Sequence, residues 1–102
     1  MVTMCETMTT SEALLLLGQR RDPTAWAALI EREGTGIRRT CLRILGDADL
    51  AEDACQETLL HLRELAGQFR PQAGAAEAGA RAWVLRVAAH AAAGPDRRSR
   101  PR

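Results

Sequence analysis

Residues 47–65 read DADLAEDACQETLLHLREL, and this stretch decides the fold. Its apolar and small residues recur at the three- and four-residue spacing of an amphipathic helix. Asp49 and Glu52 have the acid-x-x-Glu form of a capping box, and Gly67 is a typical stop signal. We therefore predict one helix over residues 50–66. The side chains that this helix turns to the core are Ala51, Ala54, Cys55, Thr58, Leu62 and Leu65.

The opposite side of the predicted helix is acidic, because residues 47–57 contain five acids and no base. Leu60 falls in the middle of this side. An apolar side chain ringed by polar ones is typical of a small protein-binding hot spot. A solvated acidic face with one exposed leucine has the same spacing, so the pattern alone leaves both interpretations open. The residues that share this side are Asp53, Gln56, Glu57, Leu60 and Glu64.

Further helices are predicted on both sides of this stretch. Asp22 followed by Pro23 is a strong helix start, and Gly46 ends the helical pattern that follows. Gly34–Gly36 interrupts that pattern, so we expect a break there. Gly94-Pro95 ends the last helix, because proline clashes with the carbonyl four residues back. The core face of this last helix comprises Ala80, Trp83, Val84, Val87, Ala88 and Ala91.

The composition agrees with a helical fold. The chain has 102 residues, of which 46% are hydrophobic and only 3% aromatic, which disfavours a β-sandwich or barrel. We expect an all-α protein, a small orthogonal bundle of three main helices with one of them broken at Gly34–Gly36. The helical domain spans residues 12–93 and includes a loop at 70–79. Residues 1–11 are expected to be a flexible N-terminal tail, and residues 94–102 an arginine-rich tail.

The sequence offers no catalytic constellation. Neither His61 nor His90 has a serine or cysteine partner at a recognised motif spacing, so we expect no enzyme activity and no cofactor. Three cysteines without a C-x-x-C spacing argue against disulfides and against a metal site. No signal peptide and no run of about 20 apolar residues is present, so we expect a cytoplasmic protein without a membrane partner.

Residues 51–58, AEDACQET, resemble the A-E-D-x-x-Q-E-x motif of bacterial RNA polymerase sigma factors of the extracytoplasmic-function class. The resemblance extends in order and with fitting spacing over about residues 12–93, and it concerns only the second conserved region of that family. The other segments that carry it are residues 22–30, residues 37–47 (IRRTCLRILGD), residues 69–71 (FRP) and residues 81–88 (RAWVLRVA).

This resemblance implies a non-enzymatic function in transcription initiation. It implies that Asp53, Gln56 and Glu57 bind the clamp helices of the β′ subunit of core RNA polymerase, with Leu60 on the same face. It also implies that the last helix and the 70–79 loop contact the –10 promoter element on the non-template DNA strand. An anti-sigma factor is a further partner that the resemblance implies. The DNA-binding residues that we predict are Arg86, His90, Arg97 and Arg98.

Several positions depart from the family pattern. Leu59 and Arg63 stand where aromatic residues are usual, and His90 stands where asparagine is usual. Gly94-Pro95 cuts the promoter-reading helix short. The outer face of this helix offers few hydrogen bonds to bases, so we expect weak DNA binding with little sequence preference. The residues of this outer face are Ala82, Leu85, Ala89, Ala92 and Ala93.

The sequence leaves two main functional hypotheses. The first is a sigma-factor-like module that lacks the –35-reading region, either as a truncated product or as one domain of a longer protein. The second is a helical interaction module that binds polymerase or a regulator without productive promoter recognition. An independent helix-turn-helix DNA binder is disfavoured, because the helix after the turn at Gly46–Asp49 is acidic outward and phosphates would repel it.

Overall fold

Four α-helices and one short 3-10 helix are formed by the residues that the structure, a computed structural model, describes: 8–20, 22–71 and 73–94. This confirms the predicted all-α fold class. The elements are α2 (Thr10–Arg20), α3 (Pro23–Leu45), α4 (Ala48–Leu65), the 3-10 helix η1 (Ala66–Gln68) and α5 (Ala76–Ala92).

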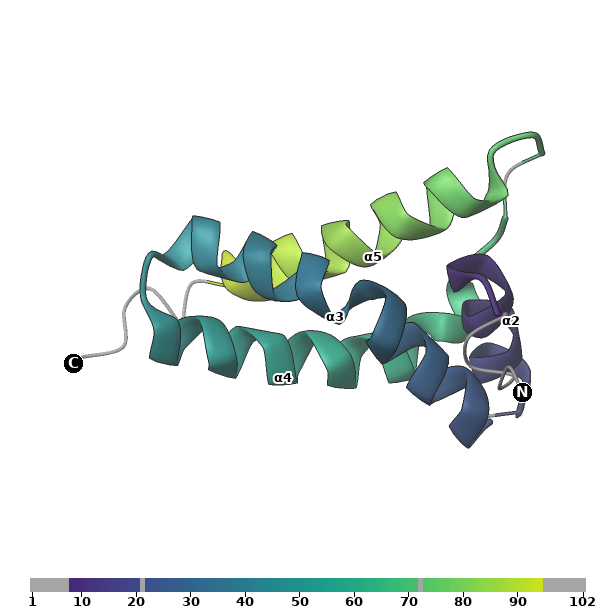
Figure 1. Ribbon diagram of the computed structural model, residues 1–102, viewed down its shortest axis with the longest axis horizontal. Helices are drawn as coiled ribbons and strands as arrows, with labels where there is room; N and C mark the ends of the chain where they lie inside the picture. The colour runs from purple at the N-terminus through teal and green to yellow at the C-terminus, as the bar shows by residue number, and fades with distance from the viewer. Residues whose placement is uncertain (1–7, 21, 72, 95–102) are drawn as a thin grey trace.

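The three longer helices lie lengthwise beside one another (Figure 1). Helix α4 runs antiparallel to α3 and α5, and α2 packs at the end of the bundle where α3 and α5 begin. All four helices contribute apolar side chains to one core. The largest fully buried apolar side chains are Leu14, Leu17, Leu29, Ile37, Leu62 and Val84.

The ends of α3 follow the local signals in the sequence. The Asp22 carboxylate accepts a hydrogen bond of 2.8 Å from the Thr24 backbone N–H, and Pro23 occupies the first helical position. At the other end, Gly46 takes up a left-handed conformation with φ of 64° and donates its N–H to the Leu42 carbonyl at 2.8 Å. Both predicted boundaries of α3 are therefore confirmed.

The predicted break at Gly34–Gly36 is wrong, because α3 continues through this segment as one helix of 23 residues. Each helical glycine costs about 1 kcal/mol relative to alanine, but packing on either side outweighs this cost. Glu33 and Ile37 are both buried. A Cβ atom added at Gly36 would lie 3.5 Å from Leu85 of α5. Gly36 therefore packs at ordinary contact distance beside α5 and does not end the helix.

Helix α4 begins two residues earlier than predicted. Its N-cap is Asp47, whose Oδ1 accepts a hydrogen bond of 2.9 Å from the Leu50 N–H. Asp49 lies inside the first helical turn instead of capping it. Both acids satisfy the sequence preference for an N-cap, and only the extended backbone of Asp47, with φ of –143° and ψ of 125°, selects between them.

The N-terminal segment differs from the expected tail over residues 8–11. Met8, Thr10 and Ser11 are buried, and Thr10 begins α2. Thr9 and Glu12 form a reciprocal capping box: the Glu12 N–H donates to Thr9 Oγ1, and the Thr9 N–H donates to Glu12 Oε1. The T-x-x-E spacing of this box is a local signal that predicts the helix start. These residues therefore belong to the helical body.

Helix α5 also begins earlier than expected, at Ala76, so the loop between η1 and α5 is shorter than the predicted 70–79. It ends at Ala92, two residues before Gly94, as predicted. Most of the predicted arginine-rich tail, including Arg97 and Arg98, lies outside the described residues. Within the described part of the chain, no helix combines the length and the apolar character that a membrane span requires.

Candidate functional site

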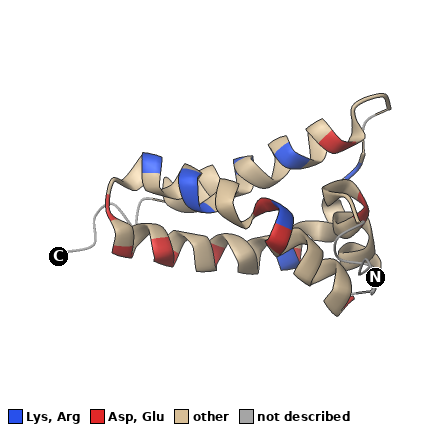
Figure 2. Ribbon diagram, viewed as in Figure 1, with Lys and Arg blue, Asp and Glu red and all other residues tan. Residues whose placement is uncertain are grey.

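The outer face of α4, formed by Asp53, Gln56 and Leu60, lies on the solvent side of the helix. The opposite side is held in the core by five buried residues, so the rotation of the helix about its axis is fixed. Leu60 keeps 60% of its surface exposed. Figure 2 shows acidic positions spaced along this helix. The buried residues are Ala51, Ala54, Cys55, Thr58 and Leu62, as predicted.

Glu57 differs from its predicted neighbours because it is half-buried. Its side chain lines a groove between α4 and α5 instead of standing on the outer face. Leu65, predicted in the core, is also half-buried and lines the same groove. A helical wheel shows only the directions of side chains around one helix axis. It does not show which of these side chains a neighbouring helix, here α5, partly covers.

A second groove lies beside the outer face of α4. This α3–α4 groove has a volume of about 500 Å³, and Gln56 is one of its lining residues. Its α3 side contributes Ile30 and Leu42, which are 37% and 45% exposed. Together with Leu60 these are the large hydrophobic residues that stand exposed among the described residues. Ile30 and Leu42 were not predicted as site residues, because the expected break at Gly34–Gly36 would separate two positions that lie on one continuous helix.

An ion pair crosses between α3 and α4 at this groove. Arg38 Nη1 lies 2.7 Å from Glu52 Oε2, and both side chains are about half exposed. Such a surface pair contributes at most about 1 kcal/mol to stability. Its consequence is local: it fixes the charge pattern at the rim of the α3–α4 groove.

The predicted DNA-binding residues Arg86 and His90 lie together on α5. Both are exposed, and both line the α4–α5 groove, which has a volume of about 550 Å³. Trp83 is half-buried in the same groove, and His61 faces it from α4. Arg97 and Arg98 lie outside the described residues, so the structure brings together two of the four predicted positions.

A smaller pocket, which we call the aromatic pocket, lies between α5 and the two residues that follow η1. Its volume is about 160 Å³. Phe69 and Trp83 form its base, with ring centroids 5.6 Å apart and planes tilted by 58°. Arg70 and Arg86 stand exposed at its edge. The residues that line it are Phe69, Arg70, Gly79, Ala82, Trp83 and Arg86.

Arg70 is held in place by the backbone of η1. Its Nη1 donates to the carbonyls of Gly67 at 2.7 Å and Phe69 at 2.9 Å. The sequence analysis did not single out Arg70 as a site residue. The sequence signal for Arg70 was its place between Phe69 and Pro71 in the FRP segment. The orientation of its side chain, however, depends on the backbone carbonyls of η1 and Phe69.

The outer face of α5 is poor in hydrogen-bond donors, as predicted for Ala82 and Ala93, which are exposed. Ala92 differs, because it is fully buried against the core. Leu85 and Ala89 are half-buried. The solvent-exposed part of this outer face of α5 is therefore narrower than the sequence predicts.

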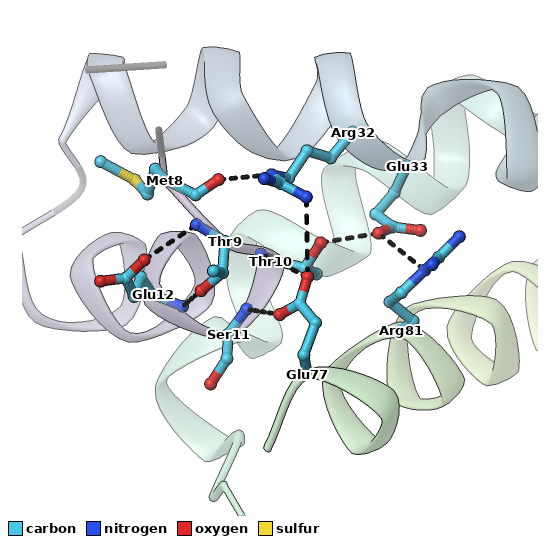
Figure 3. A network of polar contacts seen from close by, with 9 residues as sticks. All are labelled: Met8, Thr9, Thr10, Ser11, Glu12, Arg32, Glu33, Glu77 and Arg81. Atoms are coloured by element: carbon cyan, nitrogen blue, oxygen red, sulfur yellow. Dashed lines mark hydrogen bonds and ion pairs between the residues drawn. The ribbon is translucent and has the colours of Figure 1, made fainter. Parts of the chain in front are cut away.

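A network of charged and polar groups connects α2, α3 and the N-terminal end of α5 (Figure 3). Glu33 is buried to 3% exposure, and its Oε2 accepts a hydrogen bond of 2.6 Å from Thr10 Oγ1. Arg81 Nε lies 3.4 Å from the same oxygen, so the buried carboxylate has two partners. The Arg32 guanidinium donates to the Met8 carbonyl.

Glu77 of α5 completes this network. Its carboxylate accepts hydrogen bonds from the backbone N–H groups of Thr10 at 3.0 Å and Ser11 at 2.9 Å. Arg32 Nη1 lies 3.8 Å from Glu77 Oε2. Burial opposes ionisation of Glu77, but the two backbone hydrogen bonds and the Arg32 charge outweigh it, so the pKa of Glu77 lies below its ordinary value. No group of His, Cys, Asp and Glu among the described residues has the geometry of a metal site.

The comparisons with known proteins give one match. The family model of sigma-70 region 2, a domain of the sigma factors that act in transcription initiation, matches residues 29–94. This range holds most of α3 and all of α4, η1 and α5, with the outer face of α4 and the aromatic pocket. No curated protein and no solved structure gives a significant match to the chain. Because the matched residues make up more than half of the chain, it belongs to the sigma-70 region 2 family.

Proposed function

We propose that this chain is a sigma-factor region 2 module of the extracytoplasmic-function class that docks on the β′ clamp helices of core RNA polymerase and contacts the –10 promoter strand. The observation that carries the proposal is the outer face of α4. Leu60 stands 60% exposed there, and it shares this face with Asp53 and Gln56. The family membership supports core RNA polymerase as the partner of this face.

The chemistry of this surface favours a helical protein partner. Leu60 offers an apolar anchor, and the polar side chains around it form a rim that supports specificity. Ile30 and Leu42 extend the apolar surface into the α3–α4 groove. A partner helix with apolar residues on one side and cationic residues beside them would cover the apolar surface of Leu60, Ile30 and Leu42, and its cations would meet the acidic residues of α4. The clamp helices of β′ are the proposed occupants.

The aromatic pocket supports contact with single-stranded promoter DNA. Stacking on aromatic side chains is the usual way in which proteins hold unpaired bases, and the half-buried Trp83, with the buried Phe69 packed against it, is the ring that the pocket offers. Arg70 and Arg86 at its edge suit the phosphates on either side of such a base. We propose that Arg86 and His90 contact the non-template strand from α5, and that Arg97 and Arg98 add phosphate contacts.

One observation favours a second function, a polymerase-binding module without promoter reading. Ala82 and Ala93 add no hydrogen-bond donors to the exposed side of α5, so this helix reads few bases beyond what Arg86 and His90 can contact. The outer face of α4 does not depend on these residues. A chain of this kind would occupy the clamp helices and compete with complete sigma factors for them.

The polymerase part of the proposal is tested by binding to core RNA polymerase. Gln56→Ala combined with Leu60→Ala should lower the affinity by about 2 kcal/mol or more if these residues form a hot spot. Gln19→Ala is the matched control, because Gln19 is an exposed glutamine on α2 and does not belong to the outer face of α4. Unchanged affinity of a correctly folded double variant would reject the interface.

The DNA part is tested with single strands that carry the –10 sequence or a scrambled sequence, over a salt series. Three to five phosphate contacts by the arginines give a salt slope of about –2 to –4. A preference for the –10 sequence supports promoter reading and rejects the second function. Equal binding of both strands with retained polymerase binding supports the second function instead.

The same proposal places the chain in the cytoplasm, where core RNA polymerase works. An anti-sigma factor would act by covering the outer face of α4 or the α3–α4 groove. Its binding would then compete with core polymerase, which a competition assay measures directly.

A further inference from the structure

Helix α2 lies outside the residues that match the sigma-70 region 2 family, since the match begins at Leu29. It nevertheless contacts η1, which leads directly into the pocket residues Phe69 and Arg70, and α5, which provides the other lining residues. Figure 1 shows it packed at the end of the bundle beside η1. We propose that α2 is a positioning element that sets the distance between η1 and α5 and thereby holds the aromatic pocket in the shape that receives a promoter base. The binding of a promoter base in this pocket rests on the proposed function, whereas the positioning of the pocket by α2 does not.

The contact between α2 and η1 is a close approach of two backbones. A Cβ atom added at Gly18 would lie 2.9 Å from the Ala66 carbonyl oxygen and 2.9 Å from the Gly67 Cα, so only glycine fits this position without a shift. Phe69 and Arg70, which line the aromatic pocket, also line the small space between α2 and η1. A change in this contact therefore moves one wall of the pocket.

The contact between α2 and α5 is made by Glu77. Its carboxylate satisfies the N–H groups of Thr10 and Ser11 in the first turn of α2, which have no partner within their own helix. The partially positive N-terminus of α2 adds to the attraction for this acid. Glu77 lies two residues before Gly79, which belongs to the other wall of the pocket. Helix α2 thus holds one wall through Gly18 and the other through Glu77.

Two variants separate this positioning from general stability. Gly18→Ala forces α2 and η1 apart, and Glu77→Gln removes the charge and one of the two acceptors from the α2–α5 contact. Gly34→Ala is the matched control, because its added Cβ meets only Ile30 Cγ2 at 3.9 Å. Neither variant touches the outer face of α4. Polymerase binding should therefore remain unchanged in Gly18→Ala and Glu77→Gln, and Gly34→Ala serves as the control for the Trp83 signal alone.

The first readout is the indole N–H signal of Trp83 in a nitrogen–proton correlation spectrum of the full chain. Trp83 packs against Phe69 across the pocket, so its signal reports the distance between the two walls. Trp26 gives the other indole signal of the chain and serves as an internal reference. We expect the Trp83 signal to shift in Gly18→Ala and in Glu77→Gln but not in Gly34→Ala.

The second readout is the preference of the polymerase-bound chain for the –10 strand over a scrambled strand. We expect this ratio to fall about fivefold or more in both variants, as partial loss of one stacked base would cause. An unchanged Trp83 signal in both variants overturns the inference, and so does a shifted signal with an unchanged –10 preference. If the wild-type chain shows no preference for the –10 strand, the proposed function is contradicted. The Trp83 signal by itself then tests whether α2 positions the aromatic pocket.

Discussion

Replacing Thr10 by valine tests whether the N-terminal residues belong to the folded domain. Valine keeps the shape and β-branching of threonine but removes the hydroxyl that donates to Glu33 at 2.6 Å. Because this carboxylate is only 3% exposed, water does not readily replace the lost donor. A hydrogen bond to a charged group contributes about 1.5–3 kcal/mol, so the free energy of unfolding should fall by that amount. For a domain of this size, the loss corresponds to a decrease in Tm of about 6–24 °C.

Thermal and urea unfolding followed by circular dichroism measures this change. Thr35→Val is the matched control on α3, because Thr35 is exposed and its replacement should change stability by less than about 0.5 kcal/mol. The double variant with Glu33→Gln should lose less than the sum of the two single variants, since both act on one contact. Equal stability of Thr10→Val and Thr35→Val would refute the docking of residues 8–11 onto the bundle.

Three further predictions address other parts of the molecule. Leu60→Ala should weaken core polymerase binding about 5- to 30-fold by titration, because covering the exposed 60% of a leucine is worth about 1–2 kcal/mol. The pKa of Glu77 in the folded protein lies below its ordinary value of 4.5, so this carboxylate stabilises the fold above pH 4.5. That stabilisation is lost as the pH falls through the pKa of the folded state. The free energy of unfolding, measured by urea titration, should therefore fall less steeply at acidic pH in Glu77→Gln than in the wild-type chain. Gly46→Ala should cost about 1 kcal/mol in urea unfolding because of the left-handed φ of 64°, whereas unchanged stability would contradict this role of Gly46.

The features predicted correctly from the sequence depend on near neighbours along the chain. The Asp22-Pro23 start and the Gly46 end of α3 involve contacts within four residues, and the core stripe of α4 follows from helical periodicity. The acidic outer face with Leu60 follows from the same periodicity. These features required no knowledge of what packs against them.

The features missed from the sequence depend on distant segments. Gly36 reads as a helix break until Leu85 of α5 is placed against it. Residues 8–11 carry the local T-x-x-E signal of Thr9 and Glu12, but the carboxylates that hold them against the bundle, those of Glu33 and Glu77, lie 23 to 67 residues away in sequence. The aromatic pocket likewise joins η1 to α5. Local propensity carries no information about these pairings.

Photo-crosslinking from the outer face of α4 within the complex with core RNA polymerase tests most directly whether this face docks on β′. A photoreactive residue placed at Leu60 should crosslink to the clamp helices of β′, because that exposed position lies at the proposed interface. The same group at Gln19 on α2 is the control and should give no β′ clamp-helix product. Mass spectrometry identifies the crosslinked peptides. Clamp-helix peptides from Leu60 alone would agree with the account, whereas their absence from a bound complex, or equal yield from both positions, would contradict it.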